Sequence, residues 1–416
     1  MKYEVSIIIP TYNKVNYTRR CLEALATYTP SDLYEVIIVD NGSTDATRGF
    51  LKSLEGDVKL LLNSLNQGFA RACNAGAEVA QGRLLLFLNN DTEPLPGWLN
   101  NLLAVAAAEP QIGAVGCKLL FPDDTVQHAG VVVGLDPITG QLCPYHLYYR
   151  FDGLDPLVNR QRDLQAVTGA CLLIPKALFF ELGGFDERYY NGYEDVDLCF
   201  RVRQKGHRVI YTPRAKLIHH ESISGPERFR KSRENLEILN SRWLGRIPPD
   251  ETRIYVEDGL VVRYEEHQGT LTKSIDHLRA VPVVVPAGSA SADTHRGQVA
   301  GGHFPQMKLI VLDESPPARN LGATLSKISS ACDGVLFWGR PGSVDGGLLV
   351  ELLANLTLAP CVGAVKGPDA FLLRPELAGP VADIFLTENW EERMGRRVES
   401  WGYRVLALDR SGRKPA

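Results

Sequence analysis

Three polar residues, Asn89, Asn90 and Asp91, follow directly on the apolar run Leu84–Leu88. The run has the composition of a strand that is buried on both faces of a sheet. Two prolines and a Gly-Trp pair come next, so the chain turns and begins a helix near Trp98. The amides and the carboxylate are therefore expected where a parallel sheet opens to solvent, and their oxygens could hold a polar ligand there.

Polar side chains follow three other predicted strands in the same way. Ligands of parallel sheets bind beyond the carboxyl ends of the strands, so the four groups could face one crevice. Taken singly, each group has an ordinary structural interpretation: Thr44 is a good helix N-cap and Asn41-Gly42 is a turn dipeptide. Taken together, they favour a binding site. The other three groups are Pro10-Thr11-Tyr12-Asn13, Asp40-Asn41-Gly42-Ser43 and Asn63–Gly68.

The predicted crevice offers no glycine-rich cradle for phosphates. No G-x-G-x-x-G motif follows the first strand, and no G-x-x-x-x-G-K-[ST] motif occurs in the sequence. A nucleotide that binds here would be held by side chains, with or without a metal.

A second cluster of candidate residues lies between residues 189 and 225. On a helix over residues 194–205, Asp195 falls at the centre of an apolar arc, where a carboxylate is costly unless it has a partner or a task. The helix dipole also favours a carboxylate in the first turn, but it does not require one that faces inward. We therefore interpret Asp195 as functional. The opposite, polar face is expected to be solvated and comprises Glu194, Asp197, Arg201, Gln204 and Lys205.

Two histidines, His219 and His220, close the strand-like run Ala215–Ile218. A single exposed histidine would be ordinary. A pair at a strand end, after the helix that carries Asp195, indicates a contact to a metal or a phosphate.

The elements that would position these residues alternate regularly through the first half of the chain. Amphipathic helical segments separate apolar runs, a pattern typical of a parallel sheet covered on both faces. The sequence therefore predicts an α/β fold with a mostly parallel central sheet. The four predicted strands are Val5–Ile9, Val36–Val39, Val58–Leu62 and Leu84–Leu88.

Composition excludes several classes of protein. The 416 residues predict two or three domains, and a net charge of −4 without a basic stripe argues against nucleic-acid binding. Eight scattered cysteines without a C-x-x-C pair indicate a reducing, cytoplasmic location. The apolar part of the N-terminus is too short for a signal peptide, and no stretch reaches the roughly 18 uncharged residues of a transmembrane helix.

Seven segments, in this order, resemble the family-2 glycosyltransferases of the GT-A, Rossmann-like fold, especially those that add single sugars such as rhamnose to bacterial polysaccharides. The resemblance covers about residues 1–245 and implies an inverting enzyme, a nucleotide-sugar donor (a UDP-, dTDP- or GDP-sugar) and a divalent metal, Mg or Mn. The segments are VSIIIPTYN, IIVDNGSTD, NQGFARACNAG, LFLNNDTEPLPGWL, VTGACLLIPKALFFELGGFDE, GYEDVDLCFR and LIHHESIS.

The resemblance also implies roles for individual residues. Asp195 takes the place of the catalytic base, with Glu194 beside it, and His219 that of a metal ligand, with His220 close behind. Asn89 replaces the first carboxylate of the family's Asp-x-Asp motif, which leaves Asp91 as the charged metal ligand, so we expect a metal that arrives with the donor. The expected donor-binding residues are Thr11, Tyr12, Asn13, Asp40, Asn66, Arg71, Asn89 and Asn90.

Two other classes of function stay open. A non-catalytic nucleotide-sugar-binding protein would keep Asp40 but would have no reason to keep an inward-facing Asp195. A sugar nucleotidyltransferase would need a glycine-rich, basic loop after the first strand, which PTYNKVNYT is not. The acceptor is expected to be a glycan or a lipid-linked glycan, and a lipid-linked acceptor would bring the protein to the inner membrane face. Aromatic residues near 145–151 could line an acceptor groove or pack a flap.

The expected domains are a catalytic domain over residues 1–247, a linker or irregular segment over 248–306 and an α/β domain over 307–416. The last domain shows a faint repeat of the first: strands 308–312, 334–338 and 361–365 are expected to match 58–62, 84–88 and 112–116. Gly339, Arg340 and Pro341 stand where the first copy has its polar triplet, so this copy is predicted to be inactive. The alternative that two α/β segments are similar by chance stays open. Whether the protein forms a homodimer also stays open.

Overall fold

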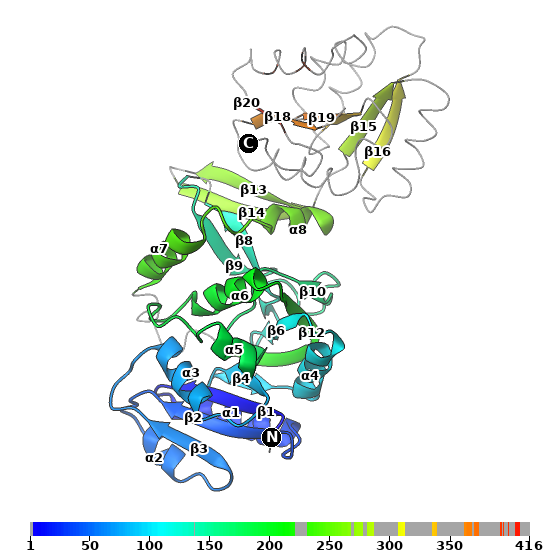
Figure 1. Cartoon of the computed structure of the whole chain (residues 1–416). Coiled ribbons are helices and arrows are strands. Elements are labelled where there is room, and N and C mark those ends of the chain that lie inside the picture. Colours follow the sequence, from blue (N-terminus) through cyan, green and yellow to red (C-terminus); the bar gives the residue numbers. More distant parts are fainter. Residues whose placement is uncertain are drawn as a thin grey trace. The chain divides into compact units, whose positions relative to one another are not determined.

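The chain forms two compact units, Met1–Pro249 and Asp250–Ala416. Figure 1 shows the structure, a computed structural model. The boundary lies close to the one expected after residue 247. The structure describes residues 3–136, 138–220, 231–267, 270–277, 281–286, 307–312, 335–338, 362–367, 370–373, 392, 394, 398 and 404–407.

The first unit is built on one large sheet whose main path runs β3-β2-β1-β4-β11-β6-β12-β10. Neighbours along β3, β2, β1 and β4 are parallel, as are β6 and β12, whereas β11 is antiparallel to both of its neighbours. The short strands β5 and β7 pair with β12 and β6. The strands are β1 Val5–Thr11, β2 Tyr34–Asp40, β3 Val58–Leu62, β4 Leu84–Leu88, β5 Thr92–Pro94, β6 Ile112–Leu120, β7 Val126–His128, β10 Arg162–Asp163, β11 Cys171–Pro175 and β12 Arg208–His219.

Helices follow the strands of this sheet in alternation, as the sequence predicts (Figure 1). A separate hairpin, β8 Val131–Leu135 and β9 Leu142–His146, is inserted after β7. The prediction of an α/β fold with a mostly parallel central sheet is confirmed. The helices are α1 Val15–Tyr28, α2 Thr47–Lys52, α3 Phe69–Glu78, α4 Trp98–Ala108, α5 Lys176–Glu181, α6 Glu194–Gln204 and α7 Ser232–Trp243.

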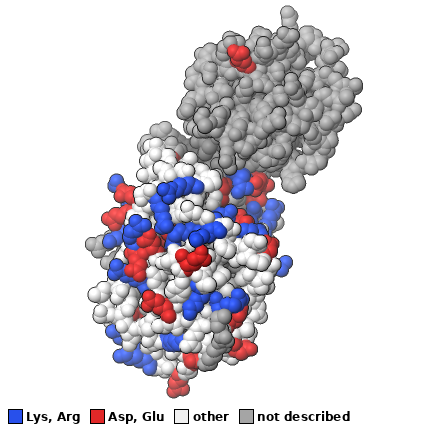
Figure 2. Space-filling view, viewed as in Figure 1, with Lys and Arg blue, Asp and Glu red and all other residues white. Residues whose placement is uncertain are grey.

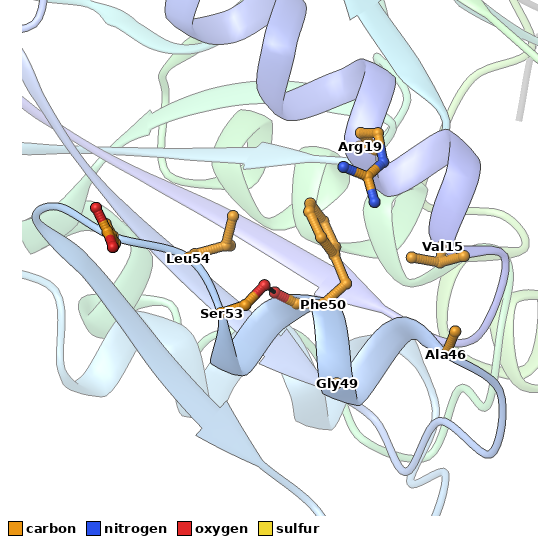
Figure 3. A pocket seen from close by; sticks show the side chains of 8 residues that line it. Val15, Arg19, Ala46, Gly49, Phe50, Ser53 and Leu54 are labelled. Carbon is orange, nitrogen blue, oxygen red and sulfur yellow. Dashed lines mark hydrogen bonds between the residues drawn. The ribbon is translucent and has the colours of Figure 1, made fainter.

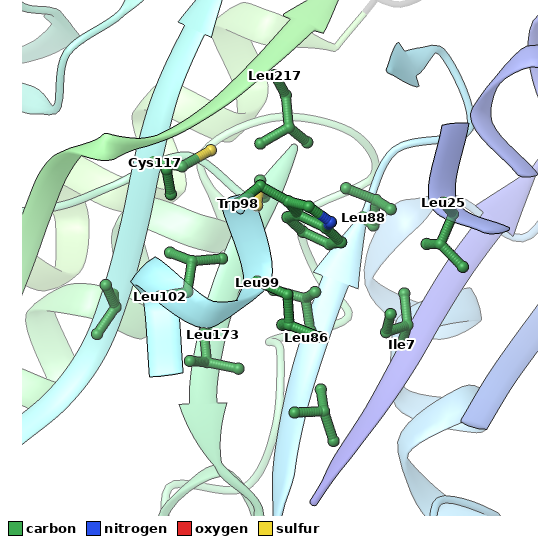
Figure 4. Packing of buried hydrophobic residues seen from close by; sticks show 14 of the residues in the cluster. Ile7, Leu25, Leu86, Leu88, Trp98, Leu99, Leu102, Cys117, Leu173 and Leu217 are labelled. Carbon is green, nitrogen blue, oxygen red and sulfur yellow. The ribbon is translucent and has the colours of Figure 1, made fainter. Parts of the chain in front are cut away.

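Both faces of the sheet are covered, which explains why its strands are continuously apolar. Leu86 and Leu88 of β4 point to the face on which Trp98 and Leu102 of α4 pack (Figure 4). Phe87, between them in β4, points to the other face and contacts the rings of α5 and the loop after it. The buried Trp98 donates its indole N–H to the Thr29 hydroxyl at 3.0 Å, so its polar atom is satisfied.

The polar face predicted for α6 is not solvated surface, and this prediction is wrong for Glu194, Asp197 and Arg201. All three residues are buried, and Arg201 Nε donates to Asp197 Oδ2 at 2.8 Å. The reason at Asp197 is α7, which packs over this face: Arg242 Nη1 and Trp243 Nε1 donate to Asp197 Oδ1 at 3.0 and 2.8 Å. A helical wheel of α6 alone carries no information about a covering helix.

The inserted segment after β6 is held by a buried lysine. Lys118 Nζ donates to the Gly153 carbonyl at 2.8 Å and to Asn159 Oδ1 at 2.7 Å, and burial lowers the pKa of Lys118 to about 8. Of the aromatic residues in this segment, Tyr148 is fully buried and serves packing, whereas Tyr149 is 48% exposed. These aromatic residues were expected either to line an acceptor groove or to pack a flap. The structure supports packing for Tyr148.

The second unit begins with α8 (Glu251–Glu257) and a hairpin of β13 (Leu260–His267) and β14 (Thr270–His277). A six-stranded sheet follows, in the order β16-β15-β17-β19-β18-β20. The structure thus differs from the linker expected over 248–306, because three strands lie between residues 260 and 286; residues 287–306 lie outside the described part. The strands of this sheet are β15 Val281–Pro286, β16 Met307–Leu312, β17 Val335–Trp338, β18 Val362–Gly367, β19 Ala370–Leu373 and β20 Arg404–Ala407.

Acidic and basic side chains are interspersed over the face of the first unit that Figure 2 shows. This mixture agrees with the small net charge of −4. Among the helices in the described part of the chain, none is both long enough and apolar enough to cross a bilayer.

Candidate active site

Asp91 and His219 meet because the end of β12 runs antiparallel to β5. His219 is paired with Thr92, and the His220 N–H donates to the Asp91 carbonyl at 3.0 Å. This pairing brings His219 Nε2 to 3.1 Å from Asp91 Oδ1, in a buried position. The segments are 128 residues apart in sequence, so the long return of β12 creates this contact.

Each ring nitrogen of His219 has polar neighbours. His219 Nδ1 lies 3.2 Å from Gln127 Oε1, to which it donates in the tautomer that carries the ring proton on Nδ1. Asn89 Nδ2, a donor, lies 3.4 Å from His219 Nε2. In that tautomer His219 Nε2 presents a lone pair next to the Asp91 carboxylate, whereas in the other tautomer Nε2–H donates to Asp91 Oδ1. These two acceptors, His219 Nε2 and Asp91 Oδ1, are called the acceptor pair below.

The geometry of the acceptor pair fits a divalent metal. Two neighbouring ligands of an octahedral ion lie about 3 Å apart when each bond is about 2.1 Å long, and the acceptor pair is 3.1 Å apart. Carboxylate oxygen and imidazole nitrogen are both ligands of first-row divalent metals. Within the described residues, no group of three or more His, Cys, Asp or Glu side chains is arranged to hold a metal. Further ligands would therefore come from water or from a diphosphate.

The other two polar side chains at this end of the sheet have different partners. His220 Nε2 lies 2.7 Å from Glu93 Oε1, and its ring packs against Tyr17 at 5.2 Å. Asn90 Nδ2 donates to the Thr18 hydroxyl at 2.9 Å. Of the two candidate histidines, the structure thus brings His219 and not His220 to the Asp91 carboxylate.

The polar residues after β1 and β2 satisfy one another. Asp40 is fully buried and accepts from Arg48 Nε at 2.7 Å and from the Ser43 N–H at 3.1 Å. Asn13 Oδ1 accepts from the Thr44 N–H at 2.7 Å. Two predicted donor-binding residues, Asp40 and Asn13, therefore hold the two loops together. We call this set of residues the scaffold cluster: Asn13, Asp40, Ser43, Thr44 and Arg48.

The remaining predicted donor-binding residues are spread along the same edge. Thr11 is buried at the end of β1, whereas Tyr12 is 40% exposed. Asn66 Oδ1 accepts from Asn41 Nδ2 at 2.9 Å and from the Gly68 N–H at 3.0 Å, so it shapes the loop before α3. Arg71 points to the surface, where it forms an exposed ion pair with Glu187 at 3.2 Å.

Asp195 lies at the start of α6, partly exposed, against the loop that precedes β11. Its Oδ2 accepts from the Gly169 N–H at 2.7 Å and its Oδ1 from the Val196 N–H at 2.8 Å. The space at residue 169 is tight, because a Cβ there would lie 3.3 Å from the Cβ of Asp195 and from the ring of Phe69. The carboxylate is thus held in one orientation with part of its surface open.

The same loop connects Asp195 to the polar triplet. The Asn89 N–H donates to the Ala170 carbonyl at 3.0 Å, next to the Gly169 N–H that binds Asp195. The backbone of Asn89, Ala170 and Gly169 therefore connects the polar triplet to Asp195.

Glu194, the neighbour of Asp195, is buried, and its Oε2 accepts from the Gly192 N–H at 2.6 Å. Burial, and next the Asp195 carboxylate, raise the pKa of Glu194. A buried carboxyl group that is held by its own loop is less accessible to a substrate than Asp195 is.

Comparisons with known proteins match this arrangement to one family. The family model described as glycosyl transferase family 2 matches residues 6–152. An N-acetylglucosaminyl-diphospho-decaprenol L-rhamnosyltransferase from Mycobacterium tuberculosis is 30% identical over 240 residues, which is 52% of this chain and 76% of that protein. The chain belongs to glycosyl transferase family 2.

Other relatives of this family 2 member are much longer proteins. The O-antigen biosynthesis protein RfbC from Myxococcus xanthus is 39% identical over 229 residues, which is 53% of this chain but 18% of that protein. An uncharacterized protein, y4gI, from Sinorhizobium fredii is 35% identical over 252 residues, or 58% of this chain and 27% of that protein. The chain thus spans about a quarter or less of these two relatives.

Solved structures similar to this family 2 member include a mannosyltransferase from Pyrobaculum calidifontis in complex with GDP-Man and Mn²⁺. The two chains are 20% identical with a TM-score of 0.44, over 60% of this chain and 66% of that one. The structure of GalNAc-T7 with UDP, GalNAc and Mn²⁺ gives 19% identity and a TM-score of 0.43, over 52% of this chain and 44% of that one. Family membership and the mostly parallel sheet together confirm the predicted GT-A class.

The sequence did not point to two further residues of the candidate site. Gln127 contacts His219 from β7, and Arg48 pairs with Asp40 from α2. Gln127 lies in the segment FPDDTVQHAG. The sequence signal there for a functional residue was a glutamine and a histidine among apolar residues. Nothing in its spacing pointed to a partner 92 residues away.

An open groove of about 670 Å³ between α1 and α2 lies apart from the predicted site residues. Figure 3 shows the Arg19 guanidinium lying over the ring of Phe50, 4.4 Å from its centroid. The groove is lined by Val15, Arg19, Ala46, Gly49, Phe50, Ser53, Leu54 and Glu55. It shares no residue with the acceptor pair or with Asp195.

Proposed function

We propose that this chain is an inverting glycosyltransferase that moves a sugar from a nucleotide-sugar donor to a hydroxyl group of a glycan or lipid-linked glycan. The observation that carries the proposal is the acceptor pair, His219 Nε2 and Asp91 Oδ1, which lie 3.1 Å apart at the end of the sheet. With the ring proton on Nδ1, the imidazole nitrogen and the carboxylate oxygen are both metal ligands, and one cation would fit between them. Family membership supports sugar transfer as the reaction.

A divalent metal, Mg or Mn, bound at the acceptor pair would supply Lewis-acid stabilisation of the negative charge that develops on a diphosphate leaving group. Asp91 Oδ1 and His219 Nε2 would hold it, and Gln127 would keep the ring proton of His219 on Nδ1. Because this chain provides two ligands, the diphosphate oxygens of the donor would complete the site. We therefore expect metal and donor to bind together.

Asp195 is the proposed general base. The acceptor hydroxyl loses its proton to the Asp195 carboxylate while its oxygen forms a bond to the anomeric carbon. The bond from that carbon to the diphosphate oxygen breaks on the opposite side, which inverts the configuration. The backbone N–H groups of Gly169 and Val196 orient the carboxylate, and its exposed part leaves room for the hydroxyl to approach within hydrogen-bond reach.

The scaffold cluster would act on the donor indirectly. Its contacts hold the loops after β1 and β2, and the exposed ring of Tyr12 stands on the first of these loops. A nucleotide base and ribose would bind against these loops, with Asn66 shaping the third one. The identity of the nucleotide, a lipid-linked acceptor at the inner membrane face, a cytoplasmic location and a homodimer stay predictions from the sequence.

The test is nucleoside diphosphate release by the purified full chain. It is incubated with UDP-, dTDP- and GDP-sugars and with glycan or lipid-linked acceptors, after chelation and again after addition of Mg²⁺ or Mn²⁺. We expect metal-dependent release with one donor class, and an inverted anomeric configuration in the product. Donor binding without release under any condition would favour the non-catalytic binding protein. Formation of a nucleotide sugar from a nucleoside triphosphate and a sugar phosphate would favour the nucleotidyltransferase.

A further inference from the structure

The sheet of the second unit has the same strand order as the sheet of the first. Its path, β16-β15-β17-β19-β18-β20, corresponds strand for strand to β2-β1-β4-β11-β6-β12. The directions agree as well: in both sheets the fourth strand along this path is antiparallel to its two neighbours, and the other three pairs are parallel. The similarity to known family members described above reaches little more than half of the chain.

The residue pairing within the sheets agrees position by position at one end. In the first unit, β1 pairs with β2 from Val5↔Tyr34 to Pro10↔Val39. In the second, β15 pairs with β16 from Val281↔Met307 to Pro286↔Leu312, so proline takes the same place in both. A slip of one residue would change every pair in this register. The two sheets therefore agree in backbone register as well as in strand order.

The pairing agrees in the middle of the sheet too. Leu86 lies opposite Leu173 in the first unit, and Leu336, 250 residues after Leu86, lies opposite Leu372 in the second. Leu372 is in turn opposite Val365, as Leu173 is opposite Val115. Leu372 and Leu373 are both fully buried, as expected for the central antiparallel strand.

Both sheets contain the same irregularity. Between β6 and β12 the register shifts so that Gly113 is skipped: Ile112 pairs with Arg208, and Ala114 with Val209. Between β18 and β20, Val362 pairs with Arg404 and Ala364 with Val405, so that Gly363 is skipped. β-Bulges are conserved within families, so a register shift at the matched position supports a common origin of the two sheets.

We propose that residues 281–407 are a second copy of the family 2 transferase sheet, one that has lost the metal chemistry of the first. The residues that follow β17 in sequence are Gly339, Arg340 and Pro341, at the offset of 250 that relates β17 to β4, where the first copy has Asn89, Asn90 and Asp91. The chain would then carry one transfer site, a consequence that rests on the function proposed for the first unit.

One strand match expected from the sequence differs from the pairing in the structure. Met307–Leu312 occupies the place of β2, next to the counterpart of β1, and not that of β3 (Val58–Leu62). The counterpart of β1 is Val281–Pro286, which had been assigned to a linker. Apolar runs of similar length cannot distinguish neighbouring parallel strands, whereas their pairing can.

Metal stoichiometry tests the loss of chemistry. The full chain is titrated with Mn²⁺ in the presence of UDP, dTDP or GDP, and the number of bound ions per chain is measured by electron paramagnetic resonance and calorimetry. We expect one ion per chain, and none in the Asp91→Asn variant. Two ions per chain in the wild type, of which one remains in Asp91→Asn, would overturn the loss of chemistry in the second copy. A single ion that persists unchanged in Asp91→Asn would instead contradict the role proposed for Asp91.

An experimental structure of the full chain tests the duplication independently. We expect Leu372 between Leu336 and Val365, with a bulge at Gly363. A different strand order, or a register shifted by one residue, would overturn the duplication. If the wild-type chain binds no Mn²⁺ at all, the metal site of the proposed function fails, whereas the duplication stands or falls on this structure alone.

Discussion

The scaffold cluster and the acceptor pair differ in how their polar groups are hydrogen-bonded. In the scaffold cluster, each acceptor faces a donor of the fold: Asp40 faces Arg48 and the Ser43 N–H, and Asn13 Oδ1 faces the Thr44 N–H. In the acceptor pair, a carboxylate faces an imidazole nitrogen that can bind a metal when the ring proton is on Nδ1. A cluster in which donors match acceptors stabilises the fold, whereas a carboxylate beside an imidazole supplies two ligands for a cation. The comparison assigns stability to one end and, in the proposed function, chemistry to the other.

The largest effect is expected at Asp195, which lies outside both clusters. Asp195→Asn should lower turnover by roughly 10²–10⁴, the usual contribution of a positioned base, and should leave nucleoside diphosphate affinity nearly unchanged. Steady-state kinetics and calorimetry measure the two quantities. The matched control is Glu194→Gln, whose turnover should stay within a few-fold of wild type. If Glu194→Gln lost turnover while Asp195→Asn kept normal turnover, Glu194 and not Asp195 would be the general base.

The second prediction breaks the acceptor pair. Asp91→Asn should abolish the metal dependence of donor affinity, because an amide lacks the charge that holds the ion. Calorimetric titration of a nucleoside diphosphate with and without Mn²⁺ measures the dependence. The neighbouring His220→Gln variant is the control and should keep it, since His220 is engaged by Glu93. If both variants kept the same metal dependence, Asp91 would not be a metal ligand.

The third prediction concerns the orientation of His219. Gln127→Leu should weaken Mn²⁺ binding by roughly 10–100-fold, as observed when an outer partner of a metal-bound histidine is lost. Gln127→Glu should retain most of the affinity, because its carboxylate also accepts from Nδ1–H. Equal losses in both variants would mean that Gln127 serves packing and does not define the tautomer.

The smallest effects are changes in stability. Without metal, Asp91→Asn should change the free energy of unfolding by less than about 1 kcal/mol, because an amide can accept from His219 Nε2–H or donate to the unprotonated nitrogen. Asp40→Asn should destabilise the protein by about 1.5–3 kcal/mol, since Arg48 loses a charged partner. Urea denaturation of both variants gives the two values. An equal loss of stability in the two variants would contradict the division between a structural cluster and a metal site.

Local sequence patterns predicted the elements of the first unit because those elements are determined locally. Val58–Leu62 and Leu84–Leu88 are strands with the predicted bounds, and a helix begins at Trp98 as expected. Burial on both faces makes such strands recognisable without knowledge of their partners. Their positions at strand ends singled out Asp91 and His219, and the resemblance to a family supplied their separate roles as metal ligands, which periodicity does not give.

The rest of the structure depends on contacts between distant segments. Asp197 and Arg201 were expected on a solvated face, because the pattern of α6 cannot show that α7 covers it. Gln127 was missed because its partner lies on another strand. The counterpart of β1 at Val281–Pro286 was missed because a short apolar run between polar segments reads as part of a linker.

Anomalous diffraction from crystals grown with Mn²⁺ and a nucleoside diphosphate tests the central claim most directly. The account predicts one anomalous peak in the first unit, within about 2.3 Å of both Asp91 Oδ1 and His219 Nε2, with phosphate oxygens completing its coordination. A nucleotide bound at this edge without a peak at the acceptor pair, or with the ion held by His220 and Glu93 instead, would contradict it.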